Sequence, residues 1–469
     1  MPPAALPTPG RLAALIAALE AGLLERDTAV RLALLAALAG EHVLLIGPPG
    51  SAKSELARRL HRAFADTRYF ERLLTRFSTP EELFGPLSLA ALEDDRYERL
   101  TDGYLPTAGI AFLDEVFKAN SAILNALLTL LNEREFDNGS TRLAVPLVSV
   151  VGASNEVPDD DALLAFYDRF LLRVPVAPVS DAAFAALLGL TSGTARVPEQ
   201  PITVPERAAI GAARDAVMLA DDALAALRSL RTWLAAKPAC APSDRRWRQF
   251  VGLLRVAAAS EGRPCVDALD LWLAPYVMAA EPTQAAAVER WFMAQVAHSA
   301  PLDAAWLTRA VEAFERQLDI EQRLPPEADA ADAAADGAGK LALARSLGAD
   351  DEGDTLASMR FVASALEARQ RRHFSPLHVS TRTAQVAQAQ ARAQSARDAV
   401  QAELDALRAQ LAARLWWPPS LRARVLAGPA ATLAVLDDLL ARLAATRAGF
   451  AALPVDTRAT SAAPAPIEA

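Results

Sequence analysis

The chain has 469 residues, of which 52% are hydrophobic, and its formal net charge is −9. This length exceeds what one hydrophobic core normally supports, so two or three domains are expected. The negative charge, spread without a basic face, argues against a dedicated nucleic-acid binder, and charged residues interrupt every Ala/Leu-rich run, which argues against a membrane span. Cys240 and Cys265 stand in unrelated contexts, so both are expected in the core of a cytoplasmic protein.

Two amphipathic helices are predicted at the start of the chain. Leu and Ile recur with helical spacing over residues 9–24, and a second helix is expected over residues 27–39. Asp27 is expected to cap this second helix, and Gly40 to end it. Both helices lead into the first predicted strand, where a nucleotide base could pack.

Residues 42–60 read as a strand, a phosphate-binding loop and a helix, HVLLIGPPGSAKSELARRL. Lys53 is expected to reach the β- and γ-phosphates, and the hydroxyl of Ser54 to meet Mg²⁺. Ala52 stands where the strict pattern has Gly, and we expect it to be tolerated if its φ stays negative. The loop and the helix start comprise Gly47, Pro48, Pro49, Gly50, Ser51, Ala52, Lys53 and Ser54. The alternative is an ordinary Gly/Pro-rich turn before a helix.

A second buried strand is predicted over residues 109–115, and it ends in Asp114 and Glu115. At the carboxyl edge of a parallel sheet, Asp114 would hold the Mg²⁺ shell and Glu115 would polarise the attacking water. The alternative is that these carboxylates only start the next turn. Upstream, Asp102-Gly103 between two tyrosines predicts a hairpin, and Asn138-Gly139 predicts another further on.

Two further strands are predicted over residues 147–153 and 171–174. Asn155 follows the first of them, where its amide could orient water against the γ-phosphate or only cap a turn. Arg169 ends a short helix expected over residues 163–170. Its guanidinium either satisfies the helix carbonyls or reaches a neighbouring subunit's nucleotide.

Residues 181–280 have a helical pattern without strand-like runs. Within them, Arg245 and Arg246 fall in the first turn of a helix that Ser243 or Asp244 could cap. Cations in a first turn oppose the helix dipole, so these arginines require an anionic partner, and a nucleotide is one candidate.

The remainder of the chain is predicted to be helical and to lack recognisable nucleotide residues. Trp416 and Trp417 are expected either in the core or in a binding patch. Leu404, Leu407 and Leu411 form a short seam, which is expected to pack within the chain, with a dimeric coiled coil as the alternative. The predicted segments are a helical connector at 281–324, an acidic linker at 325–340, helices at 356–372, 381–415 and 430–453, and a disordered tail at 454–469.

Residues 9–280 resemble the MoxR family of AAA+ ATPases, and most closely its RavA-like branch. The motifs that carry the resemblance are LLIGPPGSAKS, RFSTPEELFGPL, FLDE, NEREFDNG, ASNEVP, YDRFLLR and SDRRW, in the family's order. The resemblance implies that Lys53 and Ser54 belong to Walker A, and Asp114 and Glu115 to Walker B. It further implies that Asn155 is sensor 1, Arg169 a trans-acting arginine finger, and Arg245 sensor 2, with Arg246 competing for that role.

The implied fold is α/β plus all-α: an AAA+ module with a parallel five-stranded αβα core (1–180) and a helical lid (181–280), followed by a helical C-terminal appendage (341–453). The resemblance also implies ATP and Mg²⁺ as cofactors, a homo-hexameric ring and a von Willebrand factor A (vWA) domain partner. The expected function is remodelling or maturation of protein complexes. The alternatives are the motor of a magnesium-chelatase-like metal-insertion complex and a DNA-translocating motor. The appendage would dock a partner or brace the ring.

Overall fold

The computed structural model describes residues 6–158, 160–191, 196–237, 242–297, 305–323, 373–456 and 464–465. The chain divides into two compact units, of which unit 1 comprises Met1–Ser299 and Ala409–Val425, and unit 2 comprises Ala300–Arg408 and Leu426–Ala469. The predicted linker at 325–340 and the predicted helix at 356–372 lie outside the described residues.

Unit 1 is built on a five-stranded parallel sheet with the strand order β2-β3-β6-β1-β7. Apolar runs such as VLLI and IAFL form the buried central strands, as expected of a sheet that is covered on both faces. The strands are β1 (Val43–Ile46), β2 (Tyr69–Leu73), β3 (Ile110–Asp114), β6 (Ser149–Ser154) and β7 (Leu172–Pro175). The predicted parallel core is therefore confirmed, and the carboxyl ends of all five strands meet at one edge.

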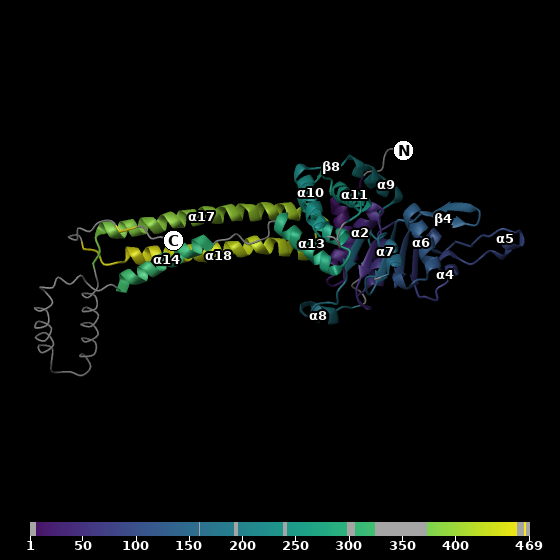
Figure 1. The fold of residues 1–469 in the computed structure, drawn as a ribbon, viewed down its shortest axis with the longest axis horizontal. Helices are drawn as coiled ribbons and strands as arrows, with labels where there is room; N and C mark the ends of the chain where they lie inside the picture. The colour runs from purple at the N-terminus through teal and green to yellow at the C-terminus, as the bar shows by residue number, and fades with distance from the viewer. Residues whose placement is uncertain are drawn as a thin grey trace, which may run out of the picture. The chain divides into compact units, whose positions relative to one another are not determined.

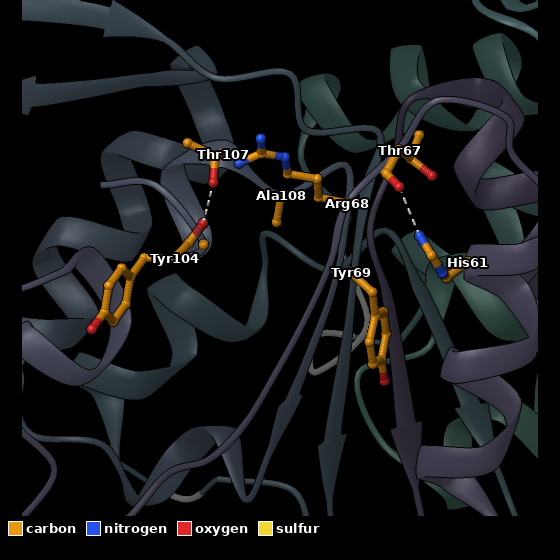
Figure 2. Close-up of a pocket in the computed structure, with 8 residues that line it drawn as sticks. His61, Thr67, Arg68, Tyr69, Tyr104, Thr107 and Ala108 are labelled. Carbon is orange, nitrogen blue, oxygen red and sulfur yellow. Dashed lines mark hydrogen bonds between the residues drawn. The ribbon is translucent and has the colours of Figure 1, made fainter. Parts of the chain in front are cut away.

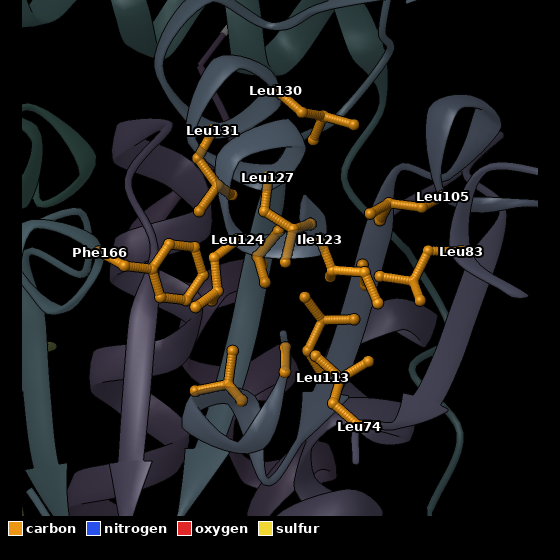
Figure 3. Packing of buried hydrophobic residues seen from close by; sticks show 14 of the residues in the cluster. Leu74, Leu83, Leu105, Leu113, Ile123, Leu124, Leu127, Leu130, Leu131 and Phe166 are labelled. Atoms are coloured by element: carbon orange, nitrogen blue, oxygen red, sulfur yellow. The ribbon is translucent and has the colours of Figure 1, made fainter. Parts of the chain in front are cut away.

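Helices cover both faces of this sheet (Figure 1). They are α1 (Pro9–Glu20), α2 (Asp27–Ala39), α3 (Lys53–Arg62), α6 (Ser121–Glu133) and α7 (Asp161–Tyr167). Figure 3 shows the core on one face, where Leu127 of α6 and Phe166 of α7 gather with Leu113 of β3. Gly40 ends α2 with a φ of 72°, as predicted, but Asp27 is the first helical residue and the capping position belongs to Arg26.

Two insertions extend the core, and one of the two predicted hairpins forms. Strands β4 (Glu135–Asn138) and β5 (Thr141–Ala144) pair around a Gly139-Ser140 turn. The prediction of a hairpin at Asp102-Gly103 is wrong. This segment leads into the 3-10 helix η1 (Leu105–Thr107), and the carboxylate of Asp102 pairs with Arg68. Short helices α4 (Pro80–Phe84) and α5 (Leu89–Glu93) precede it.

The predicted lid is mainly helical, as expected. Its elements are α8 (Asp181–Leu188), α9 (Val204–Ala216), α10 (Asp221–Ala235), α11 (Asp244–Ser260), η4 (Ala268–Leu273) and α12 (Ala274–Met278), and α13 (Pro282–Gln295) follows in the predicted connector. The prediction of no strands is wrong, since β8 (Met218–Leu219) pairs in parallel with β9 (Cys265–Val266). A two-residue strand is too short to produce an alternating pattern. Cys265 is half-buried there, and Cys240 lies outside the described residues.

Three helices follow: α14 (Ala305–Arg323), α17 (Pro376–Ala412) and α18 (Pro419–Ala451). In unit 2 they run alongside one another (Figure 1) and share a core that includes Phe314, Val386 and Leu436. Helix α18 begins well before the predicted residue 430, because Pro419 is tolerated in a first turn. None of the helices in the described part of the chain is long and apolar enough to cross a membrane.

Two C-terminal predictions need correction. Residues 409–425 fall in unit 1, although they lie within the predicted appendage at 341–453. The start of the predicted disordered tail is ordered, because Phe374 forms a bridge with Val455 and bonds to Pro454 and Asp456.

Candidate active site

The loop between β1 and α3 is held by close packing at its start. The backbone N–H of Gly47 donates to the carbonyl of Ser154 at 3.0 Å, and a Cβ at Gly47 would collide with the carbonyl of Val176. The first hydrogen bond of α3 runs from the N–H of Leu56 to Ala52. The N–H groups that precede it have no acceptor within the helix, and together with the helix dipole they favour an anion at this end.

Lys53 places its ammonium inside the loop. The side chain is buried, and Nζ donates to the carbonyl oxygens of Gly47 at 2.7 Å and Pro48 at 2.9 Å. Burial lowers the pKa of Lys53, while the nearby carboxylates of Asp114 and Glu115 oppose this shift. A partly desolvated ammonium in a ring of carbonyls and helix N–H groups suits the oxygens of a phosphate.

Ala52 corrects one sequence expectation. Its φ is +66°, in the left-handed region, so the negative φ on which its tolerance was conditioned is not found. This conformation costs an L-residue roughly 1–2 kcal/mol relative to the right-handed one. Neighbouring contacts fix the loop, since Arg26 donates from Nε to the carbonyl of Ser51 at 3.0 Å and Ser51 Oγ donates to Pro48 at 2.8 Å.

The two predicted carboxylates lie at the end of β3, at the same edge of the sheet as the loop. Asp114 accepts a hydrogen bond from the backbone N–H of Glu115 at 3.0 Å. Glu115 has a φ of 51° and its Oε1 accepts from Asn155 Nδ2 at 2.7 Å, while Lys118 Nζ lies 3.2 Å from Oε2. Lys53, Asp114, Glu115 and Asn155 therefore gather where β1, β3 and β6 end.

The predicted arginines lie at the opposite, amino edge of the sheet. Arg169 lies three residues before the first residue of β7, and Arg245 donates to Asn132 Oδ1 at 3.1 Å, near the end of α6. The Nε2 of His42, which precedes β1, lies 3.2 Å from the carbonyl of Leu131, so the end of α6 is level with the amino ends of the strands. The structure thus does not bring Arg169 or Arg245 to the phosphate loop of their own chain.

Arg246 is a buried structural residue. Its guanidinium donates to the carbonyls of Leu171 and Val277, and it pairs with Asp168 at 3.0 Å. Burial lowers its pKa, and Asp168 opposes the shift. Arg246 therefore joins the lid to the start of β7, and it finds its anionic partner in Asp168.

Sequence reasoning missed Arg26. Besides Ser51, it donates from Nη2 to the carbonyl of Ala177 at 2.8 Å, so it ties the segment before α2 to the phosphate loop and to the segment after β7. A single arginine before a helix has no periodic pattern, and only its place between two distant segments reveals this role.

A cavity of about 440 Å³ lies at the amino end of β2, away from the phosphate loop (Figure 2). His61 and Tyr69 line one side, and Tyr104 and Thr107 the other, with Arg68 between them. The His61 Nε2 lies 2.9 Å from the carbonyl of Thr67, so the imidazole is engaged in local structure. None of the residues predicted to bind nucleotide lines this cavity.

Two family models match consecutive parts of the chain. Residues 10–227 match the model described as the MoxR domain in MoxR-vWA-beta-propeller ternary systems, and residues 222–292 match an AAA lid domain. With the parallel sheet and the phosphate loop, these matches define an AAA+ ATPase module. Within that class, residues 10–227 form a module of the MoxR type.

Similar proteins match over part of their length. Two uncharacterized proteins of Methanocaldococcus jannaschii are each 58% identical over 151 residues, which is 32% of this chain and 40% of each relative. Protein MoxR of Paracoccus denitrificans is 30% identical over 180 residues, or 36% of this chain and 52% of that protein. A solved structure from Cytophaga hutchinsonii aligns with a TM-score of 0.49 and 16% identity, covering 58% of this chain and 87% of that one.

Proposed function

We propose that the chain hydrolyses ATP with Mg²⁺ and uses the energy to remodel or mature protein complexes. The observation that carries this proposal is the grouping of Lys53, Asp114, Glu115 and Asn155 at one sheet edge, with Asn155 bonded to Glu115 at 2.7 Å. An ammonium, two carboxylates and an amide beside a helix N-terminus are the groups that phosphoryl transfer to water requires.

Each residue has a role in this proposal. Lys53 and the loop N–H groups bind and orient the phosphates, and Glu115 polarises the attacking water. Asn155 holds the carboxylate of Glu115 in place through its hydrogen bond. The hydroxyl of Ser54 and the carboxylate of Asp114 are oxygen donors of the kind that Mg²⁺ prefers, and they would hold it. When bound, Mg²⁺ neutralises charge on the phosphates.

The arginines support a ring. Arg169 and Arg245 lie at the sheet edge opposite their own phosphate loop, and an arginine supplied in trans is a known device for stabilising the charge of phosphoryl transfer. We therefore assign Arg169 as an arginine finger and Arg245 as sensor 2, both acting on the nucleotide of a neighbouring subunit in a homo-hexamer.

The partners follow from the description of the matching family model. That model is named for systems in which a MoxR protein occurs with vWA and beta-propeller components. A vWA domain protein is accordingly the proposed partner of this chain, with a beta-propeller protein as a further component. The RavA-like branch and a cytoplasmic location remain predictions.

Release of phosphate from ATP by the full chain tests the proposal. Turnover is expected to require Mg²⁺ and to be lost in Lys53→Ala, with Lys237→Ala, a lid substitution outside the site, as the control. Equal turnover by Lys53→Ala and the unmodified chain would contradict the assignment. The partner is tested by capturing a purified vWA domain on Glu115→Gln protein with ATP, where no binding above that to Lys53→Ala would count against it.

A further inference from the structure

A second cavity, of about 360 Å³, lies beside the phosphate loop within unit 1. Arg26 and Thr28 line it at the start of α2, Val176 and Ala177 after β7, and Tyr276 and Ser420 from later in the chain. This volume lies within the range of roughly 300–1,000 Å³ that small-molecule pockets have.

The cavity shares walls with the phosphate loop. Arg26 lines the cavity and donates to the carbonyl of Ser51 in the loop. Val176 also lines it, and the carbonyl of Val176 lies against Gly47 at the loop's start. The cavity and the phosphate loop are therefore adjacent.

The lining suits a flat heteroaromatic group. Tyr276 adds an aromatic side chain to the lining, and Val176, Ala177 and Pro178 add apolar ones. The first hydrogen bond of α2 runs from Val30 N–H to Arg26, so the N–H groups of the helix's first residues are free to donate to the ring nitrogens of a base. These features fit the nucleoside part of a nucleotide.

Ser420 comes from a distant part of the chain, the α17–α18 turn, by which we mean residues 413–420, up to the second residue of α18. Its Oγ donates to Asp27 Oδ2 at 3.1 Å, next to the cavity. Trp416 Nε1 donates to Ser260 Oγ at 2.8 Å, and the ring of Trp417 lies 5.8 Å from that of Trp272. The turn is therefore fixed to the lid, and Trp416 and Trp417 are core residues.

Buried charges hold the same turn. Arg414 pairs with Asp270 at 3.2 Å and with Asp267, and the backbone N–H of Leu415 donates to Glu261 at 2.7 Å. Arg31 of α2 donates to the carbonyl of Leu415. The helices on both sides of the turn continue into unit 2 without interruption, because α17 and α18 each span a unit boundary.

We propose that the α17–α18 turn, through Ser420, forms a wall of the pocket for the nucleoside part of ATP, and that nucleotide binding is thereby coupled to the two long helices. The proposal rests on the proposed function and adds a regulatory connection to it. Thermodynamic linkage makes the coupling reciprocal. A ligand that contacts the turn shifts the turn's conformational equilibrium, and a conformational change at the turn alters the ligand's affinity by the same factor.

Substitutions at the turn test the proposal in the full chain. Ser420 is exposed, so Ser420→Trp can fill the cavity without disturbing a core, and the exposed Ala423, one turn further along α18, gives Ala423→Trp as the control. Affinity is measured for ATP and for inorganic tripolyphosphate, which lacks a nucleoside. Ser420→Trp is expected to weaken ATP binding at least tenfold and to leave tripolyphosphate binding unchanged, while Ala423→Trp changes neither.

The outcomes separate the two proposals. Unchanged ATP affinity in Ser420→Trp would overturn the coupling while leaving the ATPase assignment intact. Failure of the unmodified chain to bind ATP would overturn both. If Ser420→Trp, but not Ala423→Trp, loses binding of both ATP and tripolyphosphate, the phosphate loop itself is defective. That result would also overturn the proposed nucleoside contact.

A cross-link gives an independent readout. With Cys240 and Cys265 changed to Ser, the pair Asp27→Cys and Ser420→Cys can form a disulfide, because the native side chains lie within hydrogen-bond distance. Saturating ATP is expected to change the rate of disulfide formation at least threefold, and tripolyphosphate to leave it unchanged. An ATP effect no larger than that of tripolyphosphate would overturn the proposal.

Discussion

The Nη1 of Arg246 donates a hydrogen bond of 2.7 Å to the carbonyl oxygen of Val277, across the interior of unit 1. The same guanidinium bonds to Leu171, at the start of the edge strand β7. Arg246 therefore connects the lid to the sheet through buried polar groups that water cannot reach. The adjacent Arg245 is exposed and donates to Asn132 at the surface. The two arginines are therefore expected to contribute differently to stability.

Arg246→Ala is expected to destabilise the protein by about 3 kcal/mol, because it leaves the buried carbonyls of Leu171 and Val277 without this donor. Arg245→Ala is expected to change the free energy of unfolding by less than about 0.5 kcal/mol, as exposed substitutions usually do. Denaturant unfolding of the two variants side by side provides the comparison. Equal stability of the two would contradict the structural role of Arg246.

Ala52→Gly is expected to stabilise the protein, by up to about 1 kcal/mol, because glycine adopts a φ of +66° without the clash that a Cβ causes. The gain is limited by the greater freedom of glycine in the unfolded chain. Ala57→Gly, in the middle of α3, is the control and should be destabilising. Thermal unfolding of both variants decides the matter, and a loss of stability in Ala52→Gly would show that the backbone is unstrained there.

Glu41 makes stability depend on pH. Burial raises its pKa from 4.5 to about 7, against the opposing charge of Arg134 and the hydrogen bond from Gln249. The folded state therefore holds a proton between pH 4.5 and 7 that the unfolded state releases, so this group's contribution to stability is lost as the pH rises through that window.

Glu41→Gln should remove this loss. The stability of the unmodified chain, relative to that of Glu41→Gln, is expected to fall by about 1–3 kcal/mol from pH 4.5 to pH 8. Denaturant titrations across this range measure the difference. A constant difference between the two proteins would mean that Glu41 titrates normally in the folded state.

Arg169→Ala is expected to lower turnover by roughly 10³ to 10⁵ while ATP affinity changes little, as the proposed arginine-finger role predicts. Mixing tests the trans role. Rings that combine Arg169→Ala subunits with Lys53→Ala subunits should recover hydrolysis where an intact Lys53 site meets an intact Arg169. Absence of recovery in rings that are shown to be mixed would argue for action within one subunit.

Local spacing predicted much of the core. The strand, loop and helix of residues 42–60 form a continuous pattern. Asp114 and Glu115 end a strand whose apolar run is unbroken. Because both strands belong to a parallel sheet, the phosphate loop and the two carboxylates are expected at the same edge. The hairpin at Asn138-Gly139 forms too, with its turn one residue later than predicted.

Other features depend on tertiary contacts that spacing does not contain. Arg245 and Arg246 are adjacent in sequence, and only their partners decide which one is buried. The positive φ of Ala52 depends on loop contacts made by Arg26, and the contact of Ser420 with Asp27 joins opposite ends of the chain. Asp102-Gly103 has the composition of a hairpin turn, but its flanking residues find other partners, including Arg68.

The central claim is that Lys53 binds the phosphates of ATP and that Glu115 acts on the water that attacks them. The most direct measurement determines ATP affinity and turnover separately for Lys53→Ala and Glu115→Gln. Lys53→Ala should lose binding because it removes the charge facing the phosphates, whereas Glu115→Gln should bind ATP as the unmodified chain does and hydrolyse it at least about a hundredfold more slowly. Equal loss of binding in both variants, or unimpaired turnover in Glu115→Gln, would contradict the account.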